Sequence, residues 1–192
     1  MKIVFATNNE NKVNEVQSLL PNHITILSLA AIGCDEDIPE TQPTIEGNAI
    51  QKAKYVKENY GYDCFADDTG LEVTALNGEP GVFSARYAGE QRNADDNMNK
   101  LLNELQGKTD RSAQFKTIVA LILDEQQYTF EGICKGTIIN EKRGEKGFGY
   151  DPIFMANGFE ETFAQISLEE KNRVGHRGKA VQKLIDFLNT NN

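Results

Sequence analysis

The stretch KIVFATNNENKVNEVQSLLP (residues 2–21) predicts the opening of an α/β fold. Residues 2–6 are mainly apolar and predict a short, largely buried strand. A polar loop follows, and the apolar residues of 13–20 then recur at helical spacing until Pro21 ends the pattern. Strand, loop and helix in this order begin the kind of unit that layers helices on a sheet.

Strand and helix patterns continue to alternate through the first half of the chain. Strands are expected at residues 24–29, 64–66 and 71–76, the last because apolar and polar residues alternate there. A helix is expected over residues 49–60, where the apolar side chains fall on one face. Asp95 is expected to be the N-cap of a further helix.

The second half is richer in strands. The runs 112–123 and 127–139 predict a long antiparallel pair. The segment Ser167–Glu170 matches a capping box and predicts a helix, which is interrupted near Gly175. With no repeat or linker to divide it, the chain is expected to form one domain over residues 1–192: a mixed sheet flanked by helices, with a cleft between two lobes.

The composition argues against nucleic-acid and membrane partners. The net charge is −9, with 29 acidic and 20 basic residues, whereas a protein that grips a nucleic-acid backbone carries a basic face. The apolar run 118–123 is far shorter than the ~20 residues of a membrane span. Cys34, Cys64 and Cys134 are widely spaced, which is typical of reduced thiols in a cytoplasmic protein.

The segment FADDTG (residues 65–70) sets two carboxylates side by side. Like charges at close range hold one proton abnormally tightly unless a cation lies nearby. Because adjacent residues of a strand point to opposite faces, one Asp is expected to face the cleft while the other holds the turn. A simple polar turn that closes a strand is the alternative.

The loop TNNENK (residues 7–12) lies between the first strand and the first helix. Backbone N–H groups at a helix start, small polar side chains and a lysine together suit the binding of an anion. An Asn-rich turn with a solvated lysine explains the same residues, because the pattern lacks the glycines of a P-loop.

The segment PET (residues 39–41) places Glu40 in a long polar loop. One loop carboxylate and one carboxylate after a strand suffice for Mg²⁺, which takes few protein ligands and completes its shell with substrate oxygens. Glu40 therefore acquires a function only if it meets Asp67 or Asp68 in space, and simple solvation is the alternative.

Two later segments carry candidate base-recognition residues. In KGFGYDPIF (residues 146–154) glycines flank Phe148, whose ring could stack on a nucleobase or could instead plug a flexible loop. In HRGKA (residues 176–180) His176 and Arg177 could donate hydrogen bonds to a carbonyl or an anion, or could be solvated at a helix joint.

TNNENK, PET, ADDTG, SARYAG, FGYDPIF and HRGKA occur here in the order and spacing of the inosine triphosphate pyrophosphatase family. The chain resembles this family from Lys2 to its last helix. Enzymes of the family hydrolyse non-standard purine nucleoside triphosphates such as ITP, dITP and XTP. The resemblance implies an elongated mixed sheet with helices around it, two lobes with a deep central cleft, and a homodimer.

The resemblance also implies a role for each matching residue. Glu40 and Asp68 resemble the magnesium ligands, and Asp68 is also similar to the general base of the family. Thr69 is expected to touch the substrate. The implied phosphate-binding residues are Thr7, Asn8, Asn9, Glu10, Asn11 and Lys12, assisted by Lys52 and Arg86, and the implied base pocket consists of Phe148, Gly149, Tyr150, Asp151, Lys171, His176 and Arg177.

Asn8 departs from the family pattern, because glycine is common at that position, although asparagine tolerates left-handed backbone better than most residues. Two other functions stay open at this point. One is a related Maf-type pyrophosphatase that acts on pyrimidine or modified nucleotides. The other is a nucleotide-binding module without turnover, against which the pair of Glu40 and Asp68 argues, since a pure triphosphate binder gains little from added acids.

Overall fold

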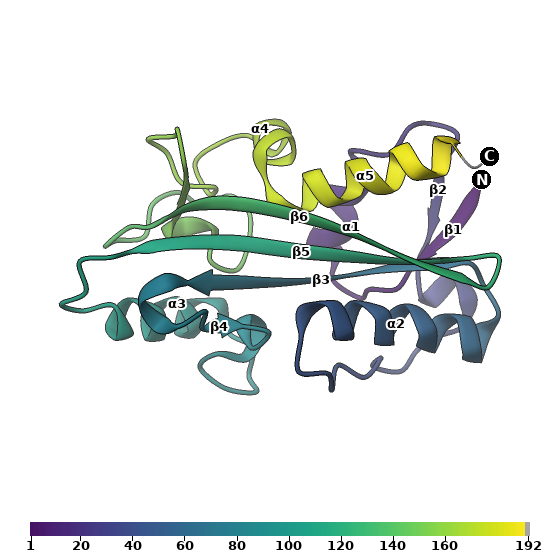
Figure 1. Cartoon of the computed structure of the whole chain (residues 1–192), viewed down its shortest axis with the longest axis horizontal. Helices are drawn as coiled ribbons and strands as arrows, with labels where there is room; N and C mark the ends of the chain where they lie inside the picture. Colours follow the sequence, from purple (N-terminus) through teal and green to yellow (C-terminus); the bar gives the residue numbers. More distant parts are fainter. Residues whose placement is uncertain (191–192) are drawn as a thin grey trace. The chain divides into compact units, whose positions relative to one another are not determined.

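The computed structural model describes residues 1–190. Figure 1 shows the path of the chain and labels its main elements. The elements are β1 (Lys2–Phe5), α1 (Glu10–Gln17), β2 (Thr25–Leu27), α2 (Ile45–Tyr60), β3 (Cys64–Val73), β4 (Pro80–Gly81), α3 (Ala94–Glu104), β5 (Ser112–Leu123), β6 (Gln126–Ile138), β7 (Phe154–Ala156), α4 (Leu168–Val174) and α5 (His176–Thr190), with short 3₁₀ turns at Ala30–Ile32, Thr74–Leu76, Ser84–Arg86 and Asp151–Ile153.

Within the described residues the strands form one seven-stranded sheet in the order β2-β1-β3-β5-β6-β7, and β4 pairs with β3. β1 runs parallel to both β2 and β3, whereas β4 pairs antiparallel with β3 and β7 antiparallel with β6. The sheet is therefore mixed, and the α/β class predicted from the sequence is confirmed. Among residues 1–190 no helix is long and apolar enough to cross a membrane.

The chain divides into two compact units, and β3, β5 and β6 contribute residues to both. The first unit contains residues 1–68, 117–132 and the described chain from Arg177 onward. The second unit contains residues 69–116 and 133–176. The predicted arrangement of one two-lobed domain with a central cleft stays a prediction.

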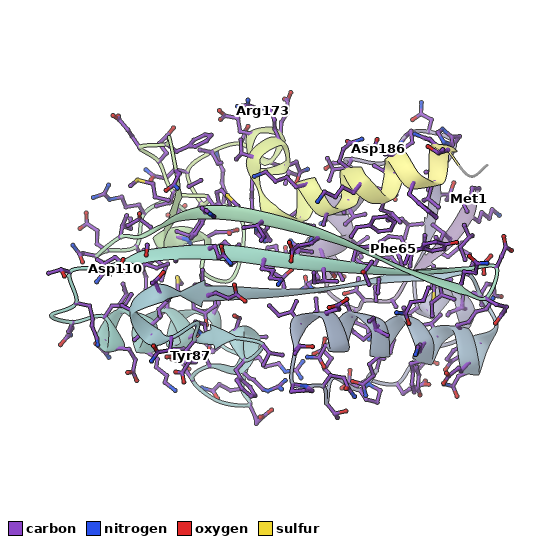
Figure 2. The ribbon with its side chains drawn as sticks, in the orientation of Figure 1. Met1, Phe65, Tyr87, Asp110, Arg173 and Asp186 are labelled. Carbon is purple, nitrogen blue, oxygen red and sulfur yellow. The ribbon has the colours of Figure 1, made fainter. Side chains whose placement is uncertain are left out.

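The core of the first unit lies between its strands and α5. Phe5 and Phe65 stack with their ring centroids 4.5 Å apart, because β1 and β3 are paired with these residues in register. The apolar side of α5, which includes Val181 and Leu184, packs on this layer. Figure 1 shows α2 on the other side of the same strands, and Figure 2 labels Phe65 among the side chains of the unit.

The second unit has a core of its own, rich in aromatic rings. Phe115 of β5 packs edge-on against Phe154 of β7, with centroids 4.6 Å apart, and stacks parallel to Phe163 at 6.1 Å. Leu101 and Leu105 from the α3 region are fully buried in the same cluster. Burial of such large apolar side chains stabilises the second unit and the loops that connect β5, β6 and β7.

Two local expectations were wrong. The Asp67–Asp68 pair does not close a strand, because β3 continues without a break through both residues to Val73. Asp95 is not the N-cap of α3; Asn93 is, and its side chain accepts a hydrogen bond from the backbone N–H of Asp96. Asp95 instead lies in the first turn, where a negative charge is favourable beside the positive end of the helix dipole.

Several other expectations are confirmed. Ser167 caps α4 by accepting from the backbone N–H of Glu170 at 3.1 Å. The helical run breaks at Gly175 before α5 begins. The three cysteines are buried and form no disulfide.

Candidate functional site

The two acids of β3 occupy different environments because they point to opposite faces of the strand. The side chain of Asp67 is 1% exposed and that of Asp68 is 14% exposed. β1 and β3 are parallel, so the loop after β1 and the second half of β3 emerge at the same edge of the sheet. The strand pairing therefore brings the TNNENK loop to the Asp pair.

Asp67 is the centre of a buried ionic network in the first unit. Its carboxylate accepts from Lys12 Nζ at 2.9 Å and from Arg177 Nε at 2.9 Å. Burial opposes the charged form, but Lys12, Arg177 and Lys52 outweigh it and lower the pKa of Asp67. Asp67 is therefore ionised at neutral pH, and it holds two cations in place.

Lys52, from the middle of α2, gathers a second set of oxygens. Its ammonium donates to Glu40 Oε1 at 2.5 Å and to the backbone carbonyl of Asp67 at 2.8 Å, and it lies 3.8 Å from Asp68 Oδ1. The structure thus brings Glu40 and Asp68 to one cationic group, although they lie 28 positions apart in the chain.

Asp68 is the more basic of the two β3 carboxylates. Burial raises its pKa above the ordinary aspartate value, and the nearby Lys52 and Lys12 offset only part of this effect. A carboxylate that is largely buried, held in a strand and raised in pKa is suited to take a proton from a water molecule. Asp67 is not suited to this role, because its charge is already committed to Lys12 and Arg177.

The TNNENK loop forms a capped helix start. Asn9 is the N-cap of α1 and accepts from the backbone N–H of Lys12 at 3.2 Å, while Thr7 Oγ1 accepts from the N–H of Asn9. Asn8 and Asn11 are exposed, as are Asn9 and Glu10. Burial lowers the pKa of Lys12, and Asp67 counteracts this. The positive end of α1 therefore opens beside a lysine that the network holds in position.

A second group of predicted residues lies in the second unit. Asp151 Oδ2 accepts from the Lys171 ammonium at 2.6 Å and from the backbone N–H of Phe148 at 2.8 Å. The same ammonium lies 4.8 Å from the centroid of the Phe148 ring. Asp151 therefore fixes both the backbone that carries the ring and a cation against the ring face.

The other predicted residues of this unit are placed as follows. His176 stacks on Phe115 with centroids 4.5 Å apart, and Tyr150 is buried and donates through its hydroxyl to the carbonyl of Ser84 at 2.8 Å. The guanidinium of Arg86 lies 5.3 Å from the Phe83 ring. The structure also places Gly149 at a positive φ in the loop and Thr69 next to Asp68 in β3.

The structure thus brings Glu40, Lys52 and Asp68 together in the first unit, and it brings Phe148, Asp151 and Lys171 together in the second. A model of the Ham1 family matches residues 3–187. The chain belongs to the Ham1 family. The resemblance predicted from the six sequence motifs is therefore confirmed.

Relatives of this Ham1-family chain match it over nearly its whole length. A dITP/XTP pyrophosphatase from Flavobacterium johnsoniae is 67% identical over 98% of this chain and 98% of the relative. One from Porphyromonas gingivalis is 52% identical over 97% of each chain. Among solved structures, the Staphylococcus aureus Ham1 protein has a TM-score of 0.91 at 41% identity and covers 100% of both chains.

One buried acid of this Ham1-family chain was not predicted from the sequence. Glu15 of α1 is 5% exposed and forms an ion pair with Arg177 Nη1. Arg177 thus donates to Glu15 and Asp67, and its pKa is raised because these acids outweigh the cost of its burial. The sequence holds no clear signal for Glu15, because its neighbour Val16 points in a different direction on a helix and the partner, Arg177, is distant in the chain.

The acidic side chains at Lys52 offer oxygen ligands to a divalent cation. Among residues 1–190 no three His, Cys, Asp or Glu side chains gather as a cation site. Two carboxylates do converge, because Glu40 and Asp68 both face the Lys52 ammonium. This set fits Mg²⁺, which takes one or two protein carboxylates and completes its shell with water and phosphate oxygens. It does not fit zinc, which takes three or four protein ligands.

Proposed function

We propose that this chain hydrolyses non-standard purine nucleoside triphosphates (ITP, dITP and XTP) to the nucleoside monophosphate and pyrophosphate. One observation carries the proposal: Glu40 and Asp68 converge on Lys52, which shares the backbone carbonyl of Asp67 with Lys12 of α1. The relatives described above, which are named dITP/XTP pyrophosphatases, support the substrate class.

We propose that Glu40 and Asp68 hold Mg²⁺ together with oxygens of the triphosphate. When bound there, Mg²⁺ would neutralise phosphate charge and lower the pKa of a coordinated water molecule. Asp68 orients the attacking water and accepts its proton, a role that its raised pKa favours. Attack at the α- or the β-phosphorus gives the same products.

The lysines of the first unit bind the phosphates in this proposal. The ammonium groups of Lys12 and Lys52 both donate to the backbone carbonyl of Asp67, and Lys12 also donates to its carboxylate. As pyrophosphate leaves, its developing charge is stabilised by these two cations and by the N–H groups at the start of α1. Phosphoryl transfer of this kind needs positioning and charge neutralisation rather than a covalent nucleophile.

The residues of the second unit bind the base. Phe148 offers its ring for stacking, and Lys171 and His176 supply donors for the 6-carbonyl of hypoxanthine or xanthine. Adenine has an amino donor at that position, so it would leave a buried donor unmatched. Arg177 was predicted, together with His176, to donate to this carbonyl; in the structure it donates to Asp67 and Glu15, and its contribution to base recognition stays a prediction.

We further propose that the protein acts in the cytoplasm as a homodimer that binds nucleoside triphosphates rather than nucleic acid. The acidic balance of the chain supports the last point, since the net charge is −9.

A panel of triphosphates tests the proposed function and its metal requirement. ITP, dITP, XTP, ATP, GTP, dUTP and TTP are each incubated with 5-fold steps of MgCl₂ around a concentration of roughly 1 mM, and pyrophosphate and phosphate are quantified separately. We expect pyrophosphate from ITP, dITP and XTP, and at least about 100-fold less when EDTA removes the metal. Preferred cleavage of dUTP or TTP would point to the Maf-type alternative, and release of single phosphates would contradict the proposal.

Replacing Phe148 with Leu tests the stacking role. Leucine keeps an apolar side chain but has no aromatic face, and base stacking contributes about 1–3 kcal/mol. We therefore expect KM for ITP to rise roughly tenfold or more while kcat changes little. Tyr62→Leu, which removes an exposed ring of the first unit, serves as the matched control and should leave KM unchanged. An unchanged KM in Phe148→Leu would remove the ring from substrate binding.

A further inference from the structure

The segment that carries Glu40 has no regular secondary structure. It lies between the 3₁₀ turn Ala30–Ile32 and α2, so strand or helix hydrogen bonds do not fix its backbone. A carboxylate on such a segment loses conformational entropy when it binds a cation, unless other contacts have already ordered it. Its position therefore depends on side chains of the neighbouring elements.

Gln51 of α2 supplies two such contacts to the residue after Glu40. Its Oε1 accepts from the backbone N–H of Thr41 at 2.9 Å, and its Nε2 donates to Thr41 Oγ1 at 2.9 Å. Two hydrogen bonds from one side-chain amide to one residue fix both the distance and the orientation of that residue. We call this pair the Gln51–Thr41 clamp.

One turn of α2 carries both Gln51 of the clamp and the Lys52 ammonium. Gln51 and Lys52 are consecutive, and Lys52 donates to Glu40 while Gln51 holds Thr41. Asn48, one turn earlier, accepts from the backbone N–H of Gln42 at 2.9 Å and so extends the same attachment. Three neighbouring loop residues are thus attached to one stretch of helix.

The attachment continues towards the end of α2. Tyr55 and Tyr60 both donate their hydroxyls to Glu36 Oε1, at 2.7 and 2.6 Å. These bonds anchor the beginning of the loop, whereas the Gln51–Thr41 clamp lies beside the proposed metal ligand itself. The clamp fixes the backbone next to Glu40, while Lys52 contacts the Glu40 carboxylate itself.

We propose that Gln51 is a positioning residue for Glu40. Gln51 holds Thr41 and so directs the Glu40 carboxylate towards Lys52, where Asp68 also lies. The inference rests on the proposed function, because it gives Glu40 the role of a Mg²⁺ ligand. Partners that orient a ligand in this way typically change metal affinity or activity by 10–100-fold when they are replaced.

Three variants separate positioning from folding. Gln51→Leu keeps the approximate size of the side chain and removes both hydrogen bonds. Gln51→Glu keeps both, because one carboxylate can accept from the N–H and the O–H of Thr41 together. Lys54→Leu places the same apolar side chain at an exposed position of α2 and serves as the control.

Two readouts are measured on the intact protein. The first is the hydrogen-exchange rate of the Thr41 amide by NMR without metal or nucleotide, which reports the clamp directly. We expect it to rise at least about fivefold in Gln51→Leu and to stay near the wild-type rate in Gln51→Glu and Lys54→Leu. The second is the MgCl₂ concentration that gives half-maximal pyrophosphate release from ITP, which should rise about tenfold in Gln51→Leu while kcat at saturating MgCl₂ stays similar.

The outcomes distinguish the inference from the proposed function. If wild-type protein releases no pyrophosphate, the proposed function fails, and the exchange rates still decide whether the clamp exists. If wild-type protein is active but Gln51→Leu has a wild-type Mg²⁺ requirement, Gln51 does not position Glu40. An equal loss in Gln51→Leu and Lys54→Leu would also overturn the inference, because it would show a general effect on α2.

Discussion

Replacing Asp68 with Asn is expected to lower kcat for ITP by about 10²–10⁴-fold, the range that a positioned general base contributes. Asparagine has nearly the same shape but cannot accept the proton of the attacking water, and it is a poorer ligand for Mg²⁺. The fold should persist, because burial already disfavours the charged form of Asp68 and raises its pKa. Initial rates at saturating ITP and MgCl₂, together with thermal unfolding, measure both effects.

Glu72→Gln is the matched control for this experiment. Glu72 lies on the same strand and accepts from Gln114 at 2.7 Å, a contact that the amide can keep. It is not part of the proposed site, so kcat should stay within about twofold of wild type. Wild-type turnover in Asp68→Asn would refute the general-base role, and parallel losses in both variants would indicate damage to β3 rather than to catalysis.

The order of strands and helices could be predicted because it follows from the spacing of apolar residues within each short segment. The apolar residues of β1, of the segment around α1 and of the β5–β6 pair recur at strand or helix spacing, and such patterns need no knowledge of the partner element. The break at Gly175 and the cap at Ser167 were equally local signals.

The continuity of β3 could not be predicted, because its middle has the residues of a turn. Asp67, Asp68 and Gly70 all have poor strand propensity. The strand nevertheless continues, since Lys12 and Arg177 neutralise Asp67 and Lys52 approaches Asp68. These cations come from three separate elements, so their meeting is a property of the tertiary structure.

The resemblance to a known family identified much of the candidate site. It did not identify the residues that hold the site residues in position. Glu40 and Asp68 were assigned from motifs, and the structure brings both to Lys52. Glu15 and Gln51 were not assigned any role, because a single acid or amide on a helix is usually a solvated surface residue. Only their contacts with Arg177 and Thr41 distinguish them from such residues.

Replacing Asp67 with Asn is expected to lower the free energy of unfolding by about 3–5 kcal/mol, the cost of removing one partner from a buried ionic network. Lys12 and Arg177 would then be buried beside a neutral amide, and Glu15 alone would remain as the acid on Arg177. Urea unfolding at pH 7, followed by circular dichroism, measures the change. Asp63→Asn, which alters a partly exposed ion pair with Lys57, should cost about 1 kcal/mol or less.

Comparison of wild type with Asp67→Asn also tests how the free energy of unfolding depends on pH. The pKa of Asp67 is lower in the folded protein than the ordinary value of about 3.9, so the unfolded chain takes up this proton first as the pH falls. The stabilisation by Asp67 is therefore fully present above about pH 5 and is lost as the pH falls towards the folded pKa. Wild-type stability should decline between about pH 5 and pH 3 more steeply than that of Asp67→Asn, so the difference between the two should narrow as the pH falls. A constant difference between wild type and variant over this range would mean that the charge of Asp67 contributes nothing to stability and that the cations are held by other contacts.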